Sequence, residues 1–556
     1  MKIYLLFQLH LNCLSSDERK EATVMPRITD TNMGEYFLLP NQGLRSYFGN
    51  VVKGQPNIFD TPFAKGESTK ELIRKWDEVL VSIKDKWPTL YEFETDMAGK
   101  IGPLSVMLPL DERMDDIEAY YKGIRLPSAP IEQRAINAVI QEWGIASTMR
   151  PRSQSETLSN MKLSTNSGSP FFRKKRDVTD LTVPCQCFIT GNEVCQTLND
   201  GGPVWLATAI LGWRGQEGGY SKDDVKQRVV WMFPFAVNVN ELQVYQPGIE
   251  YAQRFGLVPA WISNTEVDRV MTRMFDTKGE NDLVVATDFT KFDQHFNESL
   301  QNAAKAIIAS RFNGYEAENW LQEIFPIKYM IPMCYNFGDI RFGKHGMGSG
   351  SGGTNFDETL AHRSLQYEAA IHAKSRLNPN SQCLGDDGVL TYPGITVEDV
   401  VESYTSHGLE MNDQKQYAST QDTVYLRRWH HKDYRINGQC VGVYSTMRAL
   451  GRMRYLERFM DPDVWTPEAV ELRWYSILQN LEFHPLREQF ADFCMKRDKY
   501  ALGTKIPHFL DNLESQVKKV TDLMPDFLGW RATLNHSSER SYGISNWWIV
   551  KYLKSK

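Results

Sequence analysis

Two adjacent carboxylates, Asp386 and Asp387, lie in the segment CLGDDGVL at residues 383–390. A glycine on each side of the pair and short apolar runs beyond them predict a β-hairpin with negative charge at its tip. Such a tip can hold a hard divalent cation, because Mg²⁺ prefers carboxylate oxygens and commonly bridges to substrate phosphates. Alone, the triplet Gly-Asp-Asp is weak evidence. It should occur by chance in about one in ten chains of this length, and it is also typical of an acidic surface turn.

A further carboxylate stands at the end of a predicted strand. Residues 283–287 form a short run rich in valine, and Asp288 follows it directly. We expect Asp288 to face Asp386 on a neighbouring hairpin, so that the two bind a pair of Mg²⁺ ions, with Mn²⁺ as an acceptable substitute. The alternative is a solvated junction between strand and loop, which an isolated Asp-x4-Asp pattern such as Asp288 with Asp293 favours.

A glycine-rich segment lies between these two carboxylate motifs. Residues 346–354 read GMGSGSGGT and lead directly into residues 355–373, where apolar side chains recur at helical spacing. Glycines at the entry of a helix let backbone amides and hydroxyls approach a ribose or a phosphate closely. A flexible linker is the alternative, but a linker does not usually run directly into a long helix with an apolar stripe.

The elements that must position these residues belong to a chain of several parts. With 556 residues, 42% of them hydrophobic, the chain exceeds the size at which a single core usually divides. Eight cysteines spread along its length indicate reduced thiols rather than a disulfide framework. Helices are predicted at residues 70–83, 131–143 and 298–312, a strand at 228–233, and arginine-rich terminal helices at 467–478 and 485–496.

Charge is distributed unevenly along the chain. A net charge of −6 argues against a surface coated with basic residues. Basic side chains nevertheless cluster at residues 173–176 and again between 427 and 458. A local basic stripe is typical of a groove that follows phosphates, although a single run is more often a solvated helix face. No segment has the roughly 18 uninterrupted apolar residues of a membrane span, so no membrane partner is expected.

The three blocks, in this order, resemble the palm of viral RNA-dependent RNA polymerases. The D-x4-D, SG-x3-T and GDD motifs of that family are matched by Asp288 with Asp293, by residues 349–354 and by residues 385–387. Agreement in both type and order is far more specific than any one block. The glycine pattern and the overall length are most similar to picobirnavirus polymerases, which are small enzymes of double-stranded RNA viruses.

The resemblance extends beyond the core of the palm. Lys226 and Arg228 resemble the basic fingers motif that meets the triphosphate, with a charged strand edge as the alternative. Lys415 resembles the lysine that protonates the leaving pyrophosphate. The remaining matches imply contacts with template and product RNA through Thr165, Ser167, Gly168, Arg427, Arg428, Arg448 and Arg452.

The same resemblance assigns roles to the acidic residues. Asp288 and Asp386 hold both metal ions in this comparison, and Asp387 assists them. The implied nucleotide and ribose contacts are Asp293, Ser349, Gly350, Thr354 and Asn355. One position departs from the family pattern, because Glu358 stands where many members place an asparagine that helps to recognise the ribose 2′-hydroxyl.

The resemblance implies an α+β fold shaped like a right hand, with fingers, a palm of antiparallel sheet and helices, and a helical thumb, closed by fingertips. The C-terminal apolar residues 547–550 are expected to anchor against the body, with a plug in the active site as the alternative. The expected division is an N-terminal extension that bridges fingers and thumb (1–60), fingers (61–275), a first palm part (276–300), a fingers insertion (301–340), a second palm part (341–447), and the thumb with the tail (448–556).

The implied function is template-directed synthesis of RNA from ribonucleoside triphosphates, in replication and transcription of a viral double-stranded RNA genome. A monomer that contacts template RNA, product RNA and the viral capsid protein is expected, in the host cytoplasm and inside the virion. A reverse transcriptase is one alternative, but that group places bulky aromatic residues where this chain has Asp293 and Leu384. A non-catalytic RNA-binding or capsid-associated protein is another, and it leaves the order of the motifs unexplained.

Overall fold

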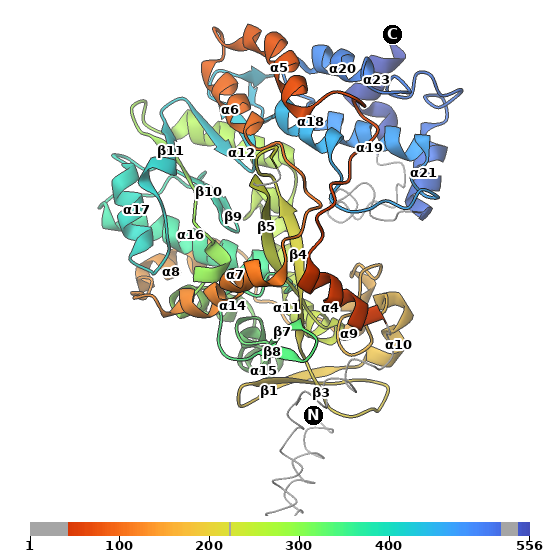
Figure 1. The fold of residues 1–556 in the computed structure, drawn as a ribbon. Coiled ribbons are helices and arrows are strands. Elements are labelled where there is room, and N and C mark those ends of the chain that lie inside the picture. Colours follow the sequence, from red (N-terminus) through yellow and green to blue (C-terminus); the bar gives the residue numbers. More distant parts are fainter. Residues whose placement is uncertain (1–42, 222–223, 524–542) are drawn as a thin grey trace, which may run out of the picture.

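The protein is described by a computed structural model over residues 43–221, 224–523 and 543–556, and its ribbon is drawn in Figure 1. Predictions for residues 1–42 lie outside the described residues. The helices are α4 (Gly43–Lys53), α5 (Thr69–Leu80), α6 (Pro88–Ala98), α7 (Met114–Lys122), α8 (Gln133–Trp143), α9 (Gln154–Ser159), α10 (Thr179–Thr182), α11 (Phe235–Phe255), α12 (Asn264–Thr277), α13 (Phe292–His295), α14 (Glu298–Arg311), α15 (Tyr315–Glu323), α16 (Thr354–His372), α17 (Val397–Thr405), α18 (Thr446–Arg454), α19 (Pro467–Gln479), α20 (Arg487–Met495), α21 (Leu513–Leu523) and α23 (Trp548–Lys554).

The strands form several small sheets rather than one large sheet. In spatial order, the sheets are β11 (Tyr417–Ser419), β6 (Val284–Thr287), β10 (Asp387–Leu390), β9 (Gln382–Leu384); then β5 (Lys226–Met232), β4 (Ala209–Gln216), β7 (Met333–Asn336), β8 (Asp339–Arg341); then β1 (Gln186–Thr190), β2 (Glu193–Thr197), β3 (Trp205–Leu206); then β12 (Asp422–Tyr425), β13 (Arg428–His431), β16 (Val443–Tyr444); and the pair β14 (Arg435–Ile436) with β15 (Gln439–Cys440).

The sheet β11-β6-β10-β9 is antiparallel throughout and has β6 and β10 at its centre. Val284, Val285 and Val389 are fully buried, which explains why these short strands read as continuous apolar runs. Helix α16 packs against β9 and aligns polar side chains with the hairpin, among them Gln366, whose Nε2 donates to the carbonyl of Gln382 at 2.8 Å. The sheet therefore has a fixed register at the end where the carboxylates lie.

The long hairpin of β4 and β5 runs through the middle of the molecule (Figure 1). Its apolar side chains, including the buried Trp231, join a core shared with α8, α11, α14 and α16. Helix α11 begins directly after Pro234, in agreement with the preference for proline at helix entries. The hairpin thus projects from the same core that supports the antiparallel sheet.

A second core joins the two ends of the chain. Figure 1 shows α5 and α6 beside α18 and α20, although these helices lie hundreds of residues apart in the sequence. The ring of Trp76 lies 4.9 Å from that of Phe490 and 5.3 Å from that of Phe493, centroid to centroid. Residues 69–98 fall within the span expected for the fingers, yet their apolar side chains are buried among the C-terminal helices.

The α+β architecture predicted from the sequence is confirmed, and each predicted helix and strand named above has a counterpart within a few residues. The C-terminal residues 547–550 are anchored against the body of the protein, as their apolar character predicts. Trp548 is buried, and its Nε1 donates to the carbonyl of Leu478 at 2.8 Å. Among the described residues, no helix has both the length and the apolar character that crossing a membrane requires.

Candidate active site

Helix α16 holds the backbone of the acidic hairpin, which is the hairpin of β9 and β10 that carries Asp386 and Asp387. Gly385 has a φ of 58°, a left-handed conformation that glycine adopts without strain. Its amide donates to Oγ1 of Thr359 at 2.9 Å, and its carbonyl accepts from Nδ1 of His362 at 2.8 Å. Asp386 and Asp387 follow with exposed side chains. The turn is therefore rigid while its two carboxylates remain open to ligands.

Asp288 lies opposite this turn. Thr287 pairs with Gly388 in the antiparallel register, so the next residue along β6 lies across from Asp387. Gln416 holds the backbone of Asp288 from both sides, because its Oε1 accepts from the amide at 2.7 Å and its Nε2 donates to the carbonyl at 2.9 Å. The predicted convergence of Asp288 with the acidic hairpin is thus present in the structure.

These carboxylates lie close together without a direct ion-pair partner among the described residues, although the charges of Lys415, Arg427 and Arg228 act on them from further away. Asp288, Asp386 and Asp387 form no side-chain hydrogen bond or ion pair with the described residues. Desolvation, followed by the charges of Asp386 and Asp288, raises the pKa of Asp387 to about 7 against the opposing charges of Arg427 and Arg228. Partial burial likewise raises the pKa of Asp288, Lys415 opposes that shift, and Asp386 adds to it.

Hard oxygen donors with mutual repulsion fit divalent cations, since a bound ion removes the repulsion between them. Among the described residues, no three acidic, histidine or cysteine side chains converge into a complete ligand set. The residues present therefore suit ions that take their remaining ligands from substrate phosphates and water, as Mg²⁺ in phosphoryl-transfer sites does.

Asp293 lies beside the glycine-rich loop that precedes α16. Its carbonyl accepts from the amide of Met347 at 2.8 Å. A side chain at Gly346 would begin only 2.3 Å from that same carbonyl, so the contact requires glycine. This half-buried aspartate is therefore fixed to the loop that the sequence predicted to approach the sugar.

Ser349 and Gly350 of the loop pack on strand β5. A Cβ at Gly350 would stand 1.5 Å from the carbonyl oxygen of Trp231, which only glycine avoids. The Oγ of Ser349 lies 3.3 Å from the carbonyl of Val229. The hydroxyl of Thr354 donates back to the loop carbonyls, 3.3 Å from that of Gly348. Close backbone approach to β5, rather than approach to a ligand alone, thus accounts for the glycine at position 350.

A buried charged network supports the loop from behind. Glu241 accepts hydrogen bonds from the hydroxyl of Ser351 and from the amide of Gly352. Lys328, which is fully buried, donates to Oδ2 of Asp357 at 2.9 Å and also attracts the charge of Glu241. Burial raises the pKa of Glu241 and lowers that of Lys328, although the attraction between the opposite charges opposes both shifts.

The basic residues of β5 face this acidic centre. Lys226 and Arg228 are exposed, and the Arg228 guanidinium acts electrostatically on both Asp293 and Asp387. The segment with Thr165, Ser167 and Gly168, for which RNA contacts are expected, lies at the end of the same hairpin, since the carbonyl of Ser167 accepts from the amide of Phe235 at 2.8 Å. Thr165 is exposed, whereas Ser167 and Gly168 are buried.

The predicted RNA-binding arginines divide into two groups. Arg427 and Arg448 both pair with Glu217, whose Oε1 lies 2.8 Å from Nε of Arg448. Arg452 lines a small pocket together with Arg448 and Glu217. Arg428 is different, and its expected RNA contact is corrected here. It is buried, and its two terminal nitrogens donate to the carboxylate of Asp268 at 2.9 and 3.1 Å, so it connects β13 to α12 instead.

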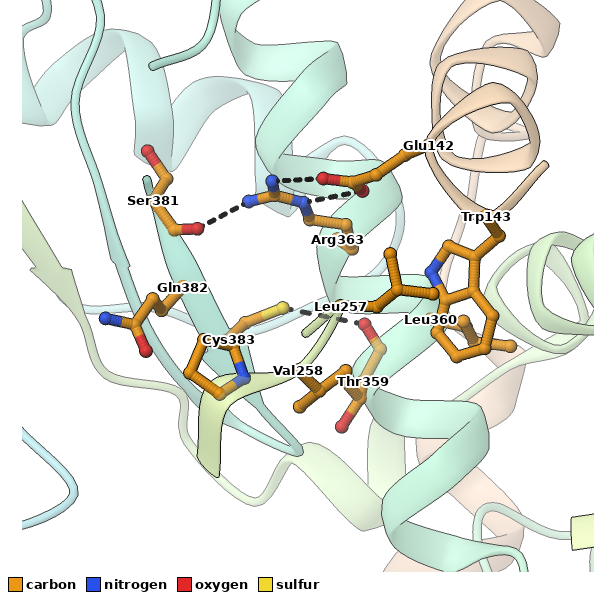
Figure 2. Close-up of a pocket in the computed structure, with 11 residues that line it drawn as sticks. Glu142, Trp143, Leu257, Val258, Thr359, Leu360, Arg363, Ser381, Gln382 and Cys383 are labelled. Atoms are coloured by element: carbon orange, nitrogen blue, oxygen red, sulfur yellow. Dashed lines mark hydrogen bonds and ion pairs between the residues drawn. The ribbon is translucent and has the colours of Figure 1, made fainter. Parts of the chain in front are cut away.

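A cavity next to the acidic hairpin shows how that hairpin is anchored (Figure 2). Arg363 on α16 forms an ion pair with Glu142 of α8 at 2.6 Å and donates to the carbonyl of Ser381 at 2.7 Å, just before β9. Cys383 lies nearby with its Sγ 3.6 Å from the carbonyl of Thr359. These contacts connect the strand that carries the acidic turn to two helices.

An antiparallel sheet with carboxylates at one end, a basic hairpin facing it, and a helical body around it define a template-directed nucleic-acid polymerase. The family described as viral RNA-dependent RNA polymerase matches residues 110–479. That match spans well over half of the chain, so this chain belongs to the viral RNA-dependent RNA polymerase family. It is an RNA-directed RNA polymerase, and hence a nucleotidyltransferase.

Individual relatives agree with this membership. A potential RNA-dependent RNA polymerase of human picobirnavirus (strain Human/Thailand/Hy005102/-) is 57% identical over 526 residues, which cover 94% of this chain and 98% of that protein. The crystal structure of the RNA-dependent RNA polymerase of a human picobirnavirus is 56% identical, with a TM-score of 0.90, over 96% of this chain and 99% of that one. The insertion-loop deletion mutant of such a polymerase is 55% identical, with a TM-score of 0.88 and the same coverage. None of these matches supports the alternatives of a reverse transcriptase or a non-catalytic protein.

Several residues of the site escaped the sequence argument. Gln416, which binds the backbone of Asp288, directly follows Lys415. The predicted role of Lys415 therefore indicated that Gln416 lies near the site. Glu217 is separated from its arginine partners by more than two hundred residues, and nothing local distinguishes it. Tyr120 is fully buried near Asp293 and Arg228, although its segment shows no motif.

Proposed function

We propose that Asp288 and Asp386 are the main ligands of two Mg²⁺ ions and that Asp387 supports them. The convergence of β6 with the acidic hairpin at one end of the sheet carries this proposal, because it gathers hard oxygen donors that form no direct ion pair with the described residues. When bound, such ions lower the pKa of the primer 3′-hydroxyl and hold the triphosphate together with the developing pyrophosphate. Mn²⁺ is the expected substitute.

The protein's own groups position the reactants for in-line displacement. Lys226 and Arg228 bind the triphosphate, since a guanidinium matches phosphate oxygens with two parallel hydrogen bonds. Lys415 donates a proton to the pyrophosphate as it leaves. Its charge already acts on Asp288, which is consistent with a location at the reacting end of the nucleotide. Asp293 and the loop at residues 349–355 receive the ribose.

Replacing Arg228 by alanine should raise the nucleotide KM by about tenfold to a hundredfold, because charge-assisted hydrogen bonds to the triphosphate are lost. The measurement is steady-state incorporation over a range of nucleotide concentrations. Arg254→Ala, an exposed arginine at the end of α11, is the control and should leave KM unchanged. An unaltered KM in Arg228→Ala would contradict the assignment.

RNA is proposed to follow Thr165, Ser167 and Gly168 on the template side, and Arg427, Arg448 and Arg452 on the product side. Glu217 shields two of these arginines in the structure described here. Glu217→Gln should therefore free them and tighten RNA binding about two- to fivefold, with a steeper dependence on salt. Filter binding at several salt concentrations measures both, with Glu457→Gln as the control, since Glu457 pairs with Arg214 on an exposed surface. Weaker binding in Glu217→Gln would contradict the shielding.

We assign α5 and α6 to the thumb, together with the thumb and tail from residue 448. The fingers comprise the rest of the chain to residue 275 and an insertion at 301–340, and the palm comprises residues 276–300 and 341–447. The segment before α5 bridges fingers and thumb.

A monomer that works in the host cytoplasm and inside the virion, in contact with capsid protein, fits an enzyme that copies a double-stranded RNA genome.

The direct test is incorporation of labelled ribonucleotides on a defined RNA template. Product whose sequence complements the template, and whose synthesis requires Mg²⁺ or Mn²⁺, is the expected result. Synthesis that persists in a chelator, or that ignores the template, would contradict the proposal.

A further inference from the structure

Glu94 of α6 is a fully buried acidic residue with no assigned role. Its Oε1 accepts from the amide of Thr446 at 2.7 Å, and its Oε2 accepts from the amide of Met447 at 3.2 Å and from the hydroxyl of Thr446. Both oxygens therefore act as acceptors, as those of a carboxylate do. Thr446 and Met447 begin α18, so this helix is capped by a residue that lies 352 positions away in the sequence.

The surroundings of Glu94 make this cap its main partner. No lysine or arginine of the described residues forms an ion pair with it, although Nε2 of His484 lies 3.6 Å from Oε1. The Nδ1 of that ring accepts from the amide of Leu486 at 3.0 Å, so the ring proton is on Nε2 and faces the carboxylate. Charge-assisted bonds from amides at the positive end of a helix stabilise a buried carboxylate. Glu94 and α18 thus hold each other in place.

The other end of α18 is held in a similar way. The amide of Thr61 donates to the carbonyl of Arg454 at 3.1 Å, and its hydroxyl donates to the carbonyl of Met453. The Nη1 of Arg473 donates to the carbonyl of Arg452 at 2.7 Å and brings a cation to this end. An anion at the start and a cation at the end match the dipole of the helix. Contacts from outside α18 therefore fix both of its ends.

Helix α18 carries two of the arginines that are proposed to bind product RNA. Arg448 and Arg452 are four residues apart, so they lie on one face of the helix, and both line a pocket with Glu217. The buried face packs into the second core and consists of Met447, Leu450 and Met453. Apolar packing is non-directional. The polar contacts at the two ends therefore determine where the arginines lie along the helix axis.

We propose that Glu94 is a positioning residue for RNA binding, which by capping α18 keeps Arg448 and Arg452 where they reach the phosphates of product RNA. Figure 1 shows α6 beside α18, in agreement with a direct effect of one helix on the other. The inference rests on the proposed function, because it requires these two arginines to bind RNA. Glu94 acts through α18, so no contact between α6 and RNA is needed.

Glu94→Gln tests the carboxylate at nearly constant size. Whichever way the new amide turns, its NH₂ group meets the backbone amide of Thr446 or of Met447, so one hydrogen bond is replaced by two opposed donors. The measurement is binding of a template–product RNA duplex by fluorescence anisotropy at several salt concentrations. Binding should weaken about three- to tenfold, and the dependence of log K on log salt should become less steep by about 1–2, which corresponds to one or two lost phosphate contacts.

Two comparisons make this result specific. Thr396→Ala removes the N-cap of α17, whose hydroxyl accepts from the amide of Asp399 at 3.1 Å, and should leave the salt dependence unchanged. The double variant Arg448→Ala/Arg452→Ala should itself show the weaker salt dependence. Adding Glu94→Gln to it should cause no further change, because coupled residues are not additive. Thermal melting identifies any variant that does not fold.

Single-nucleotide extension gives a second readout. In Glu94→Gln the KM for RNA should rise about three- to tenfold, whereas kcat at saturating RNA should stay unchanged, because α16 rather than α18 holds the acidic hairpin. A fall in kcat without a rise in the KM for RNA would contradict the assignment.

Thr446→Val is the second variant and carries the test if Glu94→Gln does not fold. It keeps the carboxylate and the amides but removes the hydroxyl that accepts from Nε1 of Trp76 at 2.7 Å and donates to Glu94. A smaller decrease in the salt dependence is expected, and an unchanged one would overturn the assignment.

An unchanged salt dependence in folded Glu94→Gln would likewise overturn it, as would a further decrease when Glu94→Gln is added to the double arginine variant. Either result leaves Glu94 as a structural cap. The proposed function fails separately. If Arg448→Ala/Arg452→Ala keeps the wild-type salt dependence, these arginines do not bind RNA, and the inference about Glu94 falls with that assignment.

Discussion

Asp386→Ala should lower nucleotide incorporation at least a thousandfold, which corresponds to about 4 kcal/mol of lost transition-state stabilisation. The physical reason is that Asp386 supplies a hard oxygen at the tip of a turn whose backbone is fixed by Thr359 and His362. Loss of that oxygen removes a metal ligand without disturbing the sheet below. Single-nucleotide extension at saturating substrate measures the effect.

Two comparisons sharpen this prediction. Asp387→Ala should cost less than Asp386→Ala, since Asp387 is proposed to support the site rather than to lead it. Asp85→Ala alters an exposed aspartate in the turn between α5 and α6 and should leave incorporation unchanged. Near wild-type incorporation by Asp386→Ala, or a larger loss in Asp387→Ala, would contradict the proposed division of roles.

Lys328→Met should destabilise the fold by about 3–5 kcal/mol, because it leaves the buried Asp357 carboxylate without its cationic partner. Both partners are fully inaccessible, and Asp357 also accepts from the hydroxyls of Tyr245 and Tyr329 at 2.8 and 2.6 Å. A loss of this size lowers the thermal midpoint by about 3–8 °C, according to whether the whole chain or one core unfolds cooperatively. Differential scanning calorimetry gives the midpoint.

The same variant should also impair the nucleotide site, since Lys328 attracts Glu241, which holds Ser351 and Gly352 of the glycine-rich loop. Lys344→Met, at an exposed lysine before that loop, is the matched control and should melt like the wild type. If Lys328→Met melted at the wild-type temperature, the network would be shown not to stabilise the fold in the way described.

The sequence predicted the parts of the site that depend on local pattern. The hairpin around Asp386 has glycines and apolar runs within eight residues, and the strand before Asp288 is a compact valine-rich run. The helical spacing of apolar residues likewise predicts helix α16. The order of these blocks then predicted their convergence, which the register of β6 with β10 bears out as geometry.

The parts that escaped prediction depend on contacts between distant segments. Nothing near Trp76 reveals that α5 packs on Phe490 of a C-terminal helix. Likewise, the basic run that contains Arg428 predicts a phosphate-binding residue. In the structure, the Arg428 guanidinium binds Asp268, which lies 160 residues away in the sequence. Pairing of this kind cannot be inferred from one sequence, because charge in a run is the same whether its partner is a phosphate or a carboxylate.

Asp288 and Asp386 are proposed to hold the catalytic metal ions together. The most direct measurement is anomalous diffraction from crystals soaked with Mn²⁺, a template–primer RNA and a non-hydrolysable ribonucleoside triphosphate. Two peaks about 3.5–4 Å apart are expected, bound by Asp288 and Asp386 and bridged by triphosphate oxygens. Peaks at other side chains, or a bound triphosphate with no metal between it and these two carboxylates, would contradict it.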